Sequence, residues 1–160
     1  MRIGVVSDTH NRLSNVVRIV ELFNASGVDR VVHTGDITQA KTLEVLAGLE
    51  APLFGVYGNN DERAALAEAA TPLEIELHDV PLYLDWADRR IVVVHDPRDL
   101  EFLPDPHWDV ALHGHTHLRT ETRSGDRLVF NPGECAGHLA GHNAIGIVDL
   151  LNLDTEILLF

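Results

Sequence analysis

The first half of the chain alternates short apolar runs with longer segments in which apolar residues recur at helical spacing. This pattern predicts three strands, each followed by a helix: strands over residues 2–7, 30–34 and 52–57, and helices over 13–26, 39–49 and 62–70. The first helix is predicted to end at Gly27 and to bury Val16, Val17, Ile19, Val20 and Phe23. The alternating order predicts parallel strands joined by right-handed crossovers, with a ligand site beyond their carboxyl ends.

The second half is dominated by strand-like runs, and only residues 97–103 indicate another helical piece. Strands are predicted over residues 73–77, 81–86, 90–95, 110–113, 118–122, 127–130, 145–150 and 155–159. Gly125 between two such runs is typical of a hairpin and favours antiparallel additions to the sheet. We therefore predict an α/β fold of two packed β-sheets flanked by helices, forming a single domain over residues 1–160.

Composition narrows the class of protein. The apolar runs are far shorter than the roughly 20 residues of a membrane helix, and no secretory leader is recognisable, so we expect a cytoplasmic protein. The formal net charge of −13 makes binding to long nucleic acid unfavourable and favours a small phosphorylated substrate, although it is also typical of a merely well-solvated surface. Cys135 is the only cysteine, so any metal must take nitrogen and oxygen ligands.

Potential metal ligands follow the first three predicted strands. Asp8 and His10 come after the first, Asp36 after the second and Asn59 after the third. Taken singly, Asp8 could cap the following helix and Asn59 could simply form a turn. Parallel strands, however, end at the same edge of a sheet, so the presence of donor residues after all three strands favours a shared site.

Histidines follow two predicted strands of the second half. His95 ends one of them, and His113, Gly114, His115, Thr116 and His117 follow another. In an extended chain the three alternating histidines would share a face, but Gly114 allows a bend that lets His115 and His117 address different metal ions. The alternative to metal binding is a loop in which these histidines are buried and hydrogen-bonded to protein partners.

Together these segments resemble the calcineurin-like metallophosphoesterases. The length and the segment Asn131-Pro132-Gly133 are similar to those of the small, single-domain YfcE-like phosphodiesterases, which share their fold with a retromer subunit. The resemblance implies a four-layer αββα sandwich of mixed sheets. It also implies two divalent cations per chain, one held by Asp8, His10, Asp36 and His117, the other by Asp36, Asn59, His95 and His115.

The resemblance implies manganese as the metal, and the ligand types also suit nickel, iron or zinc. It further implies that a hydroxide bridging two cations about 3.5–4 Å apart attacks phosphorus in line. The catalytic residues implied are Asp36, Asn60 and His95, with Asn60 offering a hydrogen bond to phosphate.

The chain departs from the family pattern at three places. Asn60 stands where many relatives carry a histidine, Asp96-Pro97 where they carry Gly-His, and Glu134 where serine is more frequent. An acidic Asp96 would repel phosphate unless it is paired or turned outward. His138 and His142 either line the mouth of the site or lie in a glycine-rich loop, with the loop favoured.

The expected function is hydrolysis of small phosphodiesters, such as cyclic nucleotides. A leaving group of low pKa needs little protonation, so such a substrate can react although Asn60 replaces a histidine that could donate a proton. The alternatives are a phosphomonoesterase of the same family and a non-catalytic metal-binding scaffold. A nuclease is disfavoured by the acidic charge, and a homo-oligomer remains possible.

Overall fold

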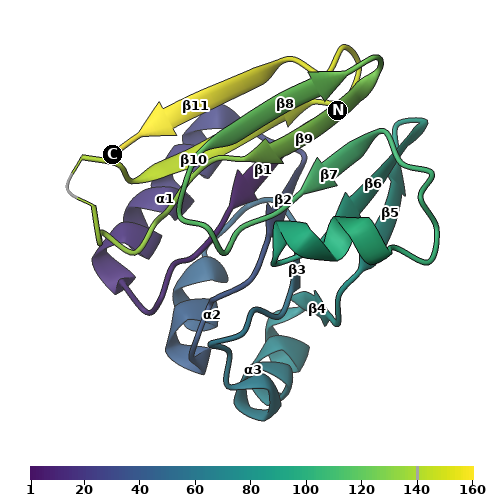
Figure 1. Cartoon of the computed structure of the whole chain (residues 1–160). Helices are drawn as coiled ribbons and strands as arrows, with labels where there is room; N and C mark the ends of the chain where they lie inside the picture. Colours follow the sequence, from purple (N-terminus) through teal and green to yellow (C-terminus); the bar gives the residue numbers. More distant parts are fainter. Residues whose placement is uncertain (140) are drawn as a thin grey trace.

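The computed structural model describes residues 1–139 and 141–160. Two mixed β-sheets pack face to face, with helices on the outside (Figure 1). The six-stranded sheet has the order β11-β10-β1-β2-β3-β4. Its strands are β1 (Arg2–Val6), β2 (Arg30–His33), β3 (Leu53–Val56), β4 (Glu76–His78), β10 (Ala144–Asp149) and β11 (Thr155–Leu159).

The five-stranded sheet has the order β5-β6-β7-β9-β8. Its strands are β5 (Leu82–Trp86), β6 (Arg89–Val93), β7 (Val110–Leu112), β8 (Thr120–Ser124) and β9 (Arg127–Asn131). The helices are α1 (Leu13–Ser26), α2 (Ala40–Leu46) and α3 (Arg63–Ala70), with short 3-10 helices η1 (Thr71–Leu73) and η2 (Pro97–Phe102). No helix in the described ranges is both long enough and apolar enough to span a membrane.

Three hydrophobic clusters separate the layers and confirm the predicted sandwich. The first lies between α1–α3 and the six-stranded sheet, and the second fills the space between the two sheets. The third lies on the outer face of the five-stranded sheet, where Leu100 and Leu103 cover Val92 and Ala111. Because both faces of each sheet are covered, the central strands are apolar on both faces.

Most of the buried face predicted for helix α1 is confirmed. Val16, Ile19 and Phe23 are buried, and Gly27 ends the helix in a left-handed conformation, donating its N–H to Phe23 O at 3.1 Å. Val17 was assigned wrongly to that face, because its side chain points outward and the residue is 48% exposed. The valine lies one step round the helix from Val16, outside the stripe that faces the sheet.

Two predictions for the second half need correction. The predicted antiparallel additions are confirmed for β5–β6, β8–β9, β10–β11 and β1–β10, but β3–β4, β6–β7 and β7–β9 pair in parallel. The predicted strand over residues 73–77 instead begins at Glu76, because residues 71–73 form a 3-10 turn, η1, to which the fixed φ of Pro72 is suited. The hairpin at Gly125 is confirmed.

Candidate metal centre

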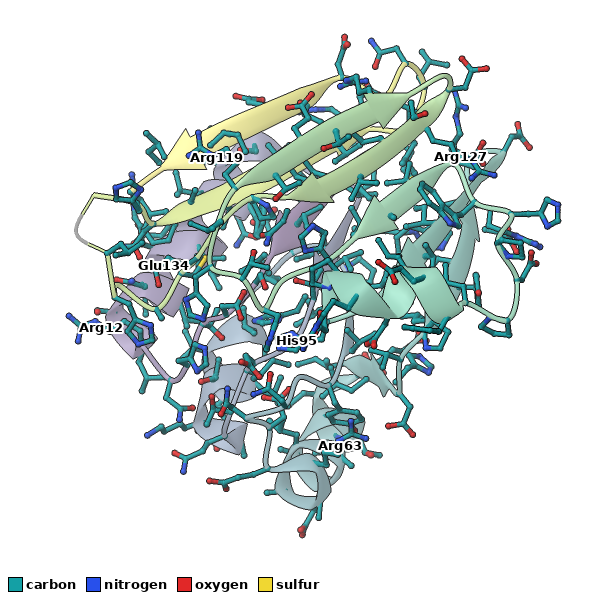
Figure 2. The ribbon with its side chains drawn as sticks, in the orientation of Figure 1. Arg12, Arg63, His95, Arg119, Arg127 and Glu134 are labelled. Atoms are coloured by element: carbon teal, nitrogen blue, oxygen red, sulfur yellow. The ribbon has the colours of Figure 1, made fainter. Side chains whose placement is uncertain are left out.

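The seven donor residues singled out from the sequence converge at one edge of the molecule. They follow the carboxyl ends of β1, β2, β3, β6 and β7, so both sheets contribute. In Figure 2, His95 lies near the middle of the ribbon, between the loop that carries Glu134 and helix α3, which begins at Arg63.

One group of donors surrounds His10. Its Nε2 lies 3.4 Å from Asp36 Oδ2 and 4.0 Å from Asp8 Oδ1. Nε2 of His117 lies 3.6 Å from the same Asp8 oxygen, and the rings of His10 and His117 stack with centroids 5.2 Å apart. The helix that follows Asp8 begins after Arg12, and no side chain in the part of the chain described caps it. Asp8 is therefore not a helix cap.

A second group of donors surrounds Asn59. Its Oδ1 lies 3.0 Å from both His95 Nε2 and His115 Nδ1, so the amide does more than form a turn. Asp36 Oδ2 lies 3.5 Å from His95 Nε2. Asp36 therefore belongs to both groups, through the same oxygen that faces His10.

Left-handed backbone conformations aim most of these side chains. Five of the donors have φ between 41° and 65°: Asp8, His10, Asp36, His115 and His117. Residues other than glycine adopt this region rarely and at a cost of about 1–3 kcal/mol each. Such a concentration of strained residues is typical of a functional site.

Two glycines allow the loops to approach each other. A Cβ atom at Gly114 would collide with Ser7 Oγ, and one at Gly58 would collide with the Asp36 carboxylate. Gly114 therefore brings the histidine loop onto Asp8, whose Oδ2 accepts the His115 backbone N–H at 3.1 Å.

The two carboxylates differ in electrostatic environment. Burial raises the pKa of Asp8 above its ordinary value. Burial also opposes ionisation of Asp36, but hydrogen bonds from His95 and Asn60 outweigh it and hold the pKa of Asp36 well below its usual range. The Asn60 backbone N–H donates to Asp36 Oδ1 at 2.9 Å, and its side-chain amide donates to Oδ2 at 2.8 Å.

Asp96 is paired, which resolves the concern that it would repel phosphate. It accepts from Arg98 Nε at 2.9 Å and from the Arg98 backbone N–H at 2.9 Å, capping η2. This pairing holds the pKa of Asp96 at about 2. A groove of about 310 Å³ opens beside the Asn59 group, and Tyr57, Arg63 and Arg98 form part of its wall.

The other histidines separate into different roles. His113 is buried beside its own loop, with Nδ1 3.2 Å from Gly114 O. His138 lies in the glycine-rich loop after β9, and there its ring stacks on that of His117 with centroids 5.3 Å apart, so it also lines the site mouth. His142 is exposed in the following loop.

Two neighbours of the centre were not assigned to it from the sequence. Glu134 is fully buried and contacts His117 through an oxygen 3.0 Å from Nδ1. The sequence signal for Glu134 is its position directly after Asn131-Pro132-Gly133, where relatives more often carry serine. Cys135 is fully buried and packs as the small apolar residue expected; burial raises the pKa of its thiol.

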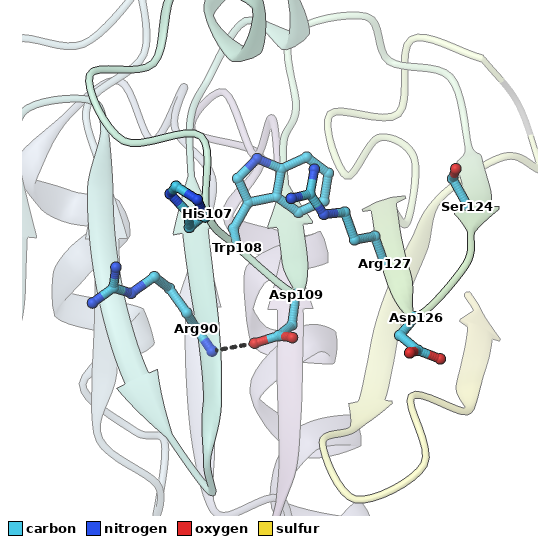
Figure 3. A pocket seen from close by; sticks show the side chains of 7 residues that line it. All are labelled: Arg90, His107, Trp108, Asp109, Ser124, Asp126 and Arg127. Carbon is cyan, nitrogen blue, oxygen red and sulfur yellow. Dashed lines mark hydrogen bonds between the residues drawn. The ribbon is translucent and has the colours of Figure 1, made fainter.

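A larger cavity of about 540 Å³ lies at the opposite strand ends, near the beginnings of β6, β7 and β9 (Figure 3). There the Arg127 guanidinium stacks 4.9 Å above the Trp108 ring, and the Arg90 backbone N–H donates to Asp109 at 2.8 Å. None of the seven donors lines this cavity.

The donor set fits divalent cations. His10 Nε2 is buried and has no hydrogen-bond partner among the described residues, yet it faces two carboxylates. Separations of 3.0–4.0 Å between donor atoms suit ligands that each stand about 2.0–2.2 Å from a common ion. Imidazole, carboxylate and amide donors are those that manganese, iron, nickel and zinc accept.

A family model described as calcineurin-like phosphoesterase superfamily domain matches residues 1–153. The chain belongs to this superfamily. Membership in the superfamily supports the assignment of the chain as a hydrolase of phosphoester bonds that uses divalent metal ions.

Similar proteins of the superfamily extend over nearly the whole chain. Phosphodiesterase MJ0936 of Methanocaldococcus jannaschii is 36% identical over 93% of this chain and 93% of its own. Phosphodiesterase YfcE of Escherichia coli strain K12 is 28% identical over 93% of this chain and 88% of its own. A solved archaeal phosphodiesterase superposes with a TM-score of 0.90 at 34% identity, covering 100% of both chains.

Proposed function

We propose that the chain is a binuclear-metal phosphodiesterase that hydrolyses small phosphodiesters such as cyclic nucleotides. The observation that carries the proposal is the position of Asp36. One oxygen of its carboxylate lies 3.4 Å from His10 and 3.5 Å from His95, which joins the two donor groups. A carboxylate shared in this way is suited to bridge two cations.

In this proposal the two donor groups hold one cation each. Asp8, His10, Asp36 and His117 hold the first, and Asp36, Asn59, His95 and His115 hold the second. Manganese is the proposed metal. When bound, the two cations supply a nucleophilic water at neutral pH and neutralise charge on the phosphoryl oxygens.

Residues of the chain would orient the substrate and the bridging carboxylate. Asn60 fixes Asp36 through two hydrogen bonds, and the second hydrogen of its amide is available to a phosphoryl oxygen. Arg63 and Arg98 lie in the wall of the groove beside the Asn59 group, each paired with a carboxylate, and their guanidinium N–H groups are the donors proposed for a small anionic substrate. The Arg98 pairing prevents Asp96 from opposing that substrate.

A diester substrate agrees with Asn60, which stands where many relatives carry a histidine that could protonate a leaving group. Asn60 cannot protonate a leaving group, whereas a leaving group of low pKa departs without protonation. The similar proteins are themselves named phosphodiesterases, which supports the same reaction class for this chain.

The test is a substrate panel with the manganese-reconstituted protein. We expect bis(p-nitrophenyl) phosphate and cyclic nucleotides to be hydrolysed with higher kcat/KM than p-nitrophenyl phosphate. Asp36→Asn should remove most of this activity because a neutral amide bridges cations poorly, whereas the exposed Glu101→Gln should retain it.

A preference for the monoester would reject the diesterase proposal in favour of the phosphomonoesterase. Metal analysis distinguishes the scaffold alternative. Fewer than one cation per chain after reconstitution, together with no hydrolysis of either ester class, would support a non-catalytic role.

A further inference from the structure

Glu134 is a buried carboxylate outside the proposed ligand set. It lies between β9 and β10 and is 0% exposed. Its Oε2 lies 3.0 Å from His117 Nδ1, and its Oε1 accepts the Leu139 backbone N–H at 2.6 Å. One oxygen therefore accepts a backbone N–H and the other faces a ring nitrogen, so both oxygens of the carboxylate are placed as hydrogen-bond acceptors.

The two nitrogens of His117 face different partners. Nδ1 faces Glu134 at 3.0 Å, and Nε2 faces Asp8 Oδ1 at 3.6 Å, inside the first donor group. A neutral imidazole has one N–H, and an ionised carboxylate can only accept. The hydrogen bond to Glu134 therefore places the proton on Nδ1 and leaves the lone pair of Nε2 directed into the site.

We infer that Glu134 is a positioning residue that fixes the tautomer and ring orientation of His117, so that Nε2 is the metal donor. The inference rests on the proposed function only in assigning His117 as a ligand. Carboxylates that accept from the second nitrogen of a ligating histidine are known to raise metal affinity, and their loss costs about 10–100-fold.

The neighbouring histidines do not share this arrangement. His138 Nδ1 lies 3.7 Å from Glu134 Oε2, beyond hydrogen-bond distance, and its side chain is 63% exposed. His115 Nε2 lies 3.6 Å from Asp96 Oδ2, and that carboxylate is engaged by Arg98. Asp96 therefore places a carboxylate close to the His115 ring without a hydrogen bond to it. Substituting Asp96 controls for the loss of a negative charge near a proposed ligand histidine.

The decisive variant is Glu134→Gln. The Leu139 N–H still needs an acceptor, so the amide oxygen remains there and the NH2 group turns toward His117. Nδ1 must then accept, and the proton moves to Nε2. Long-range 1H–15N NMR of the metal-free protein at pH 8.5 is expected to show an Nδ1–H tautomer for His117 in the native chain and an Nε2–H tautomer in the variant.

Calorimetric titration with Mn²⁺ provides the second readout. We expect the affinity of one of two sites to fall about 10–100-fold in Glu134→Gln, while the other site keeps its affinity. Asp96→Asn removes a charge of the same sign, yet should leave the tautomer of His117 unchanged. Circular dichroism of each metal-free variant establishes that it is folded.

Two results would overturn the inference. One is an Nε2–H tautomer of His117 in the native metal-free protein, which needs no variant to be folded. The other is a folded Glu134→Gln variant with the native tautomer and native Mn²⁺ affinity. Both measurements are independent of turnover, so a protein without diesterase activity would reject the proposed function while the NMR result still decided the role of Glu134.

Discussion

At the scale of single residues, His33 shows how a buried imidazole contributes to the framework of the centre. Its Nδ1 accepts the Gly35 backbone N–H at 3.2 Å, and its Nε2 lies 3.1 Å from Thr9 Oγ1. Because burial disfavours the charged form, the pKa of His33 is lowered to about 3. The ring is neutral in the folded protein and joins the loops after β1 and β2.

This burial predicts a pH dependence of stability. Below pH 6.5 the unfolded chain protonates His33 and the folded chain does not, so the free energy of unfolding falls as the pH falls from 6.5 toward 3. The expected slope from this residue is about 1.4 kcal/mol per pH unit. Urea denaturation of the metal-free protein between pH 7 and 5 should therefore show a flatter profile for His33→Gln than for the native chain.

The control is His142→Gln, because His142 is exposed in the loop after β9. This substitution should leave the slope unchanged. An unchanged slope for His33→Gln as well would show that His33 does not contribute to the pH dependence.

Residue types and strand-end positions were sufficient to predict which side chains converge. They could not predict the partners of those side chains, because partners depend on how the loops meet. The contact of Asn60 with Asp36 was not predicted, and neither was the contact of Glu134 with His117. Both contacts join segments that are far apart in the chain.

At the scale of elements, helix α1 separates a buried face from an exposed one within adjacent residues. Ile19 is fully buried against the six-stranded sheet, whereas Val17 is 48% exposed. Replacing Ile19 by alanine should lower the free energy of unfolding by about 2–5 kcal/mol, because it leaves a cavity in the core.

The matched variant is Val17→Ala, which should change the free energy of unfolding by less than about 0.5 kcal/mol. Chemical denaturation of both variants compares them directly. Equal losses would mean that Val17 also packs in the core, as the sequence pattern alone had indicated.

The helical and strand periods were sufficient to locate most elements, and antiparallel additions such as β10–β11 are confirmed, but the parallel pairs β6–β7 and β7–β9 were not predicted. Short runs such as Val110–Leu112 are equally compatible with parallel and antiparallel neighbours. The pairing is decided by the connections: residues 94–109 form a crossover that carries η2 and returns the chain in the same direction. A connection of this length has no turn signature that fixes its path.

At the scale of the whole molecule, the centre joins the two sheets. Asp8 and Asp36 follow strands of the six-stranded sheet, and His95 and His117 follow strands of the five-stranded sheet. Cations bound there should stabilise the folded chain, by about 2.7 kcal/mol when free Mn²⁺ is 100 times Kd. A thermal melt should show a higher Tm with Mn²⁺ than with EDTA.

Asp36→Asn provides the comparison for this stabilisation, because it alters the carboxylate shared by both groups. The increase in Tm with Mn²⁺ should shrink in this variant. An increase of the same size would place the stabilising cation elsewhere on the acidic surface.

The net charge of −13 also acts at this scale. Duplex DNA should bind weakly, because the protein has few cationic groups to displace counterions from the phosphate backbone. We expect duplex DNA at low salt to leave the hydrolysis rate of a small diester unchanged. Strong competition that disappears with added salt would contradict this expectation.

The burial of Cys135 provides a built-in probe of opening. It is the only cysteine in the chain, and it directly follows Glu134. A buried thiol with a raised pKa reacts with a disulfide reagent only after its surroundings open. The labelling rate of the unaltered protein therefore measures how often the packing of Cys135 in the first hydrophobic cluster opens, and slower labelling with Mn²⁺ would report that bound cations suppress this opening.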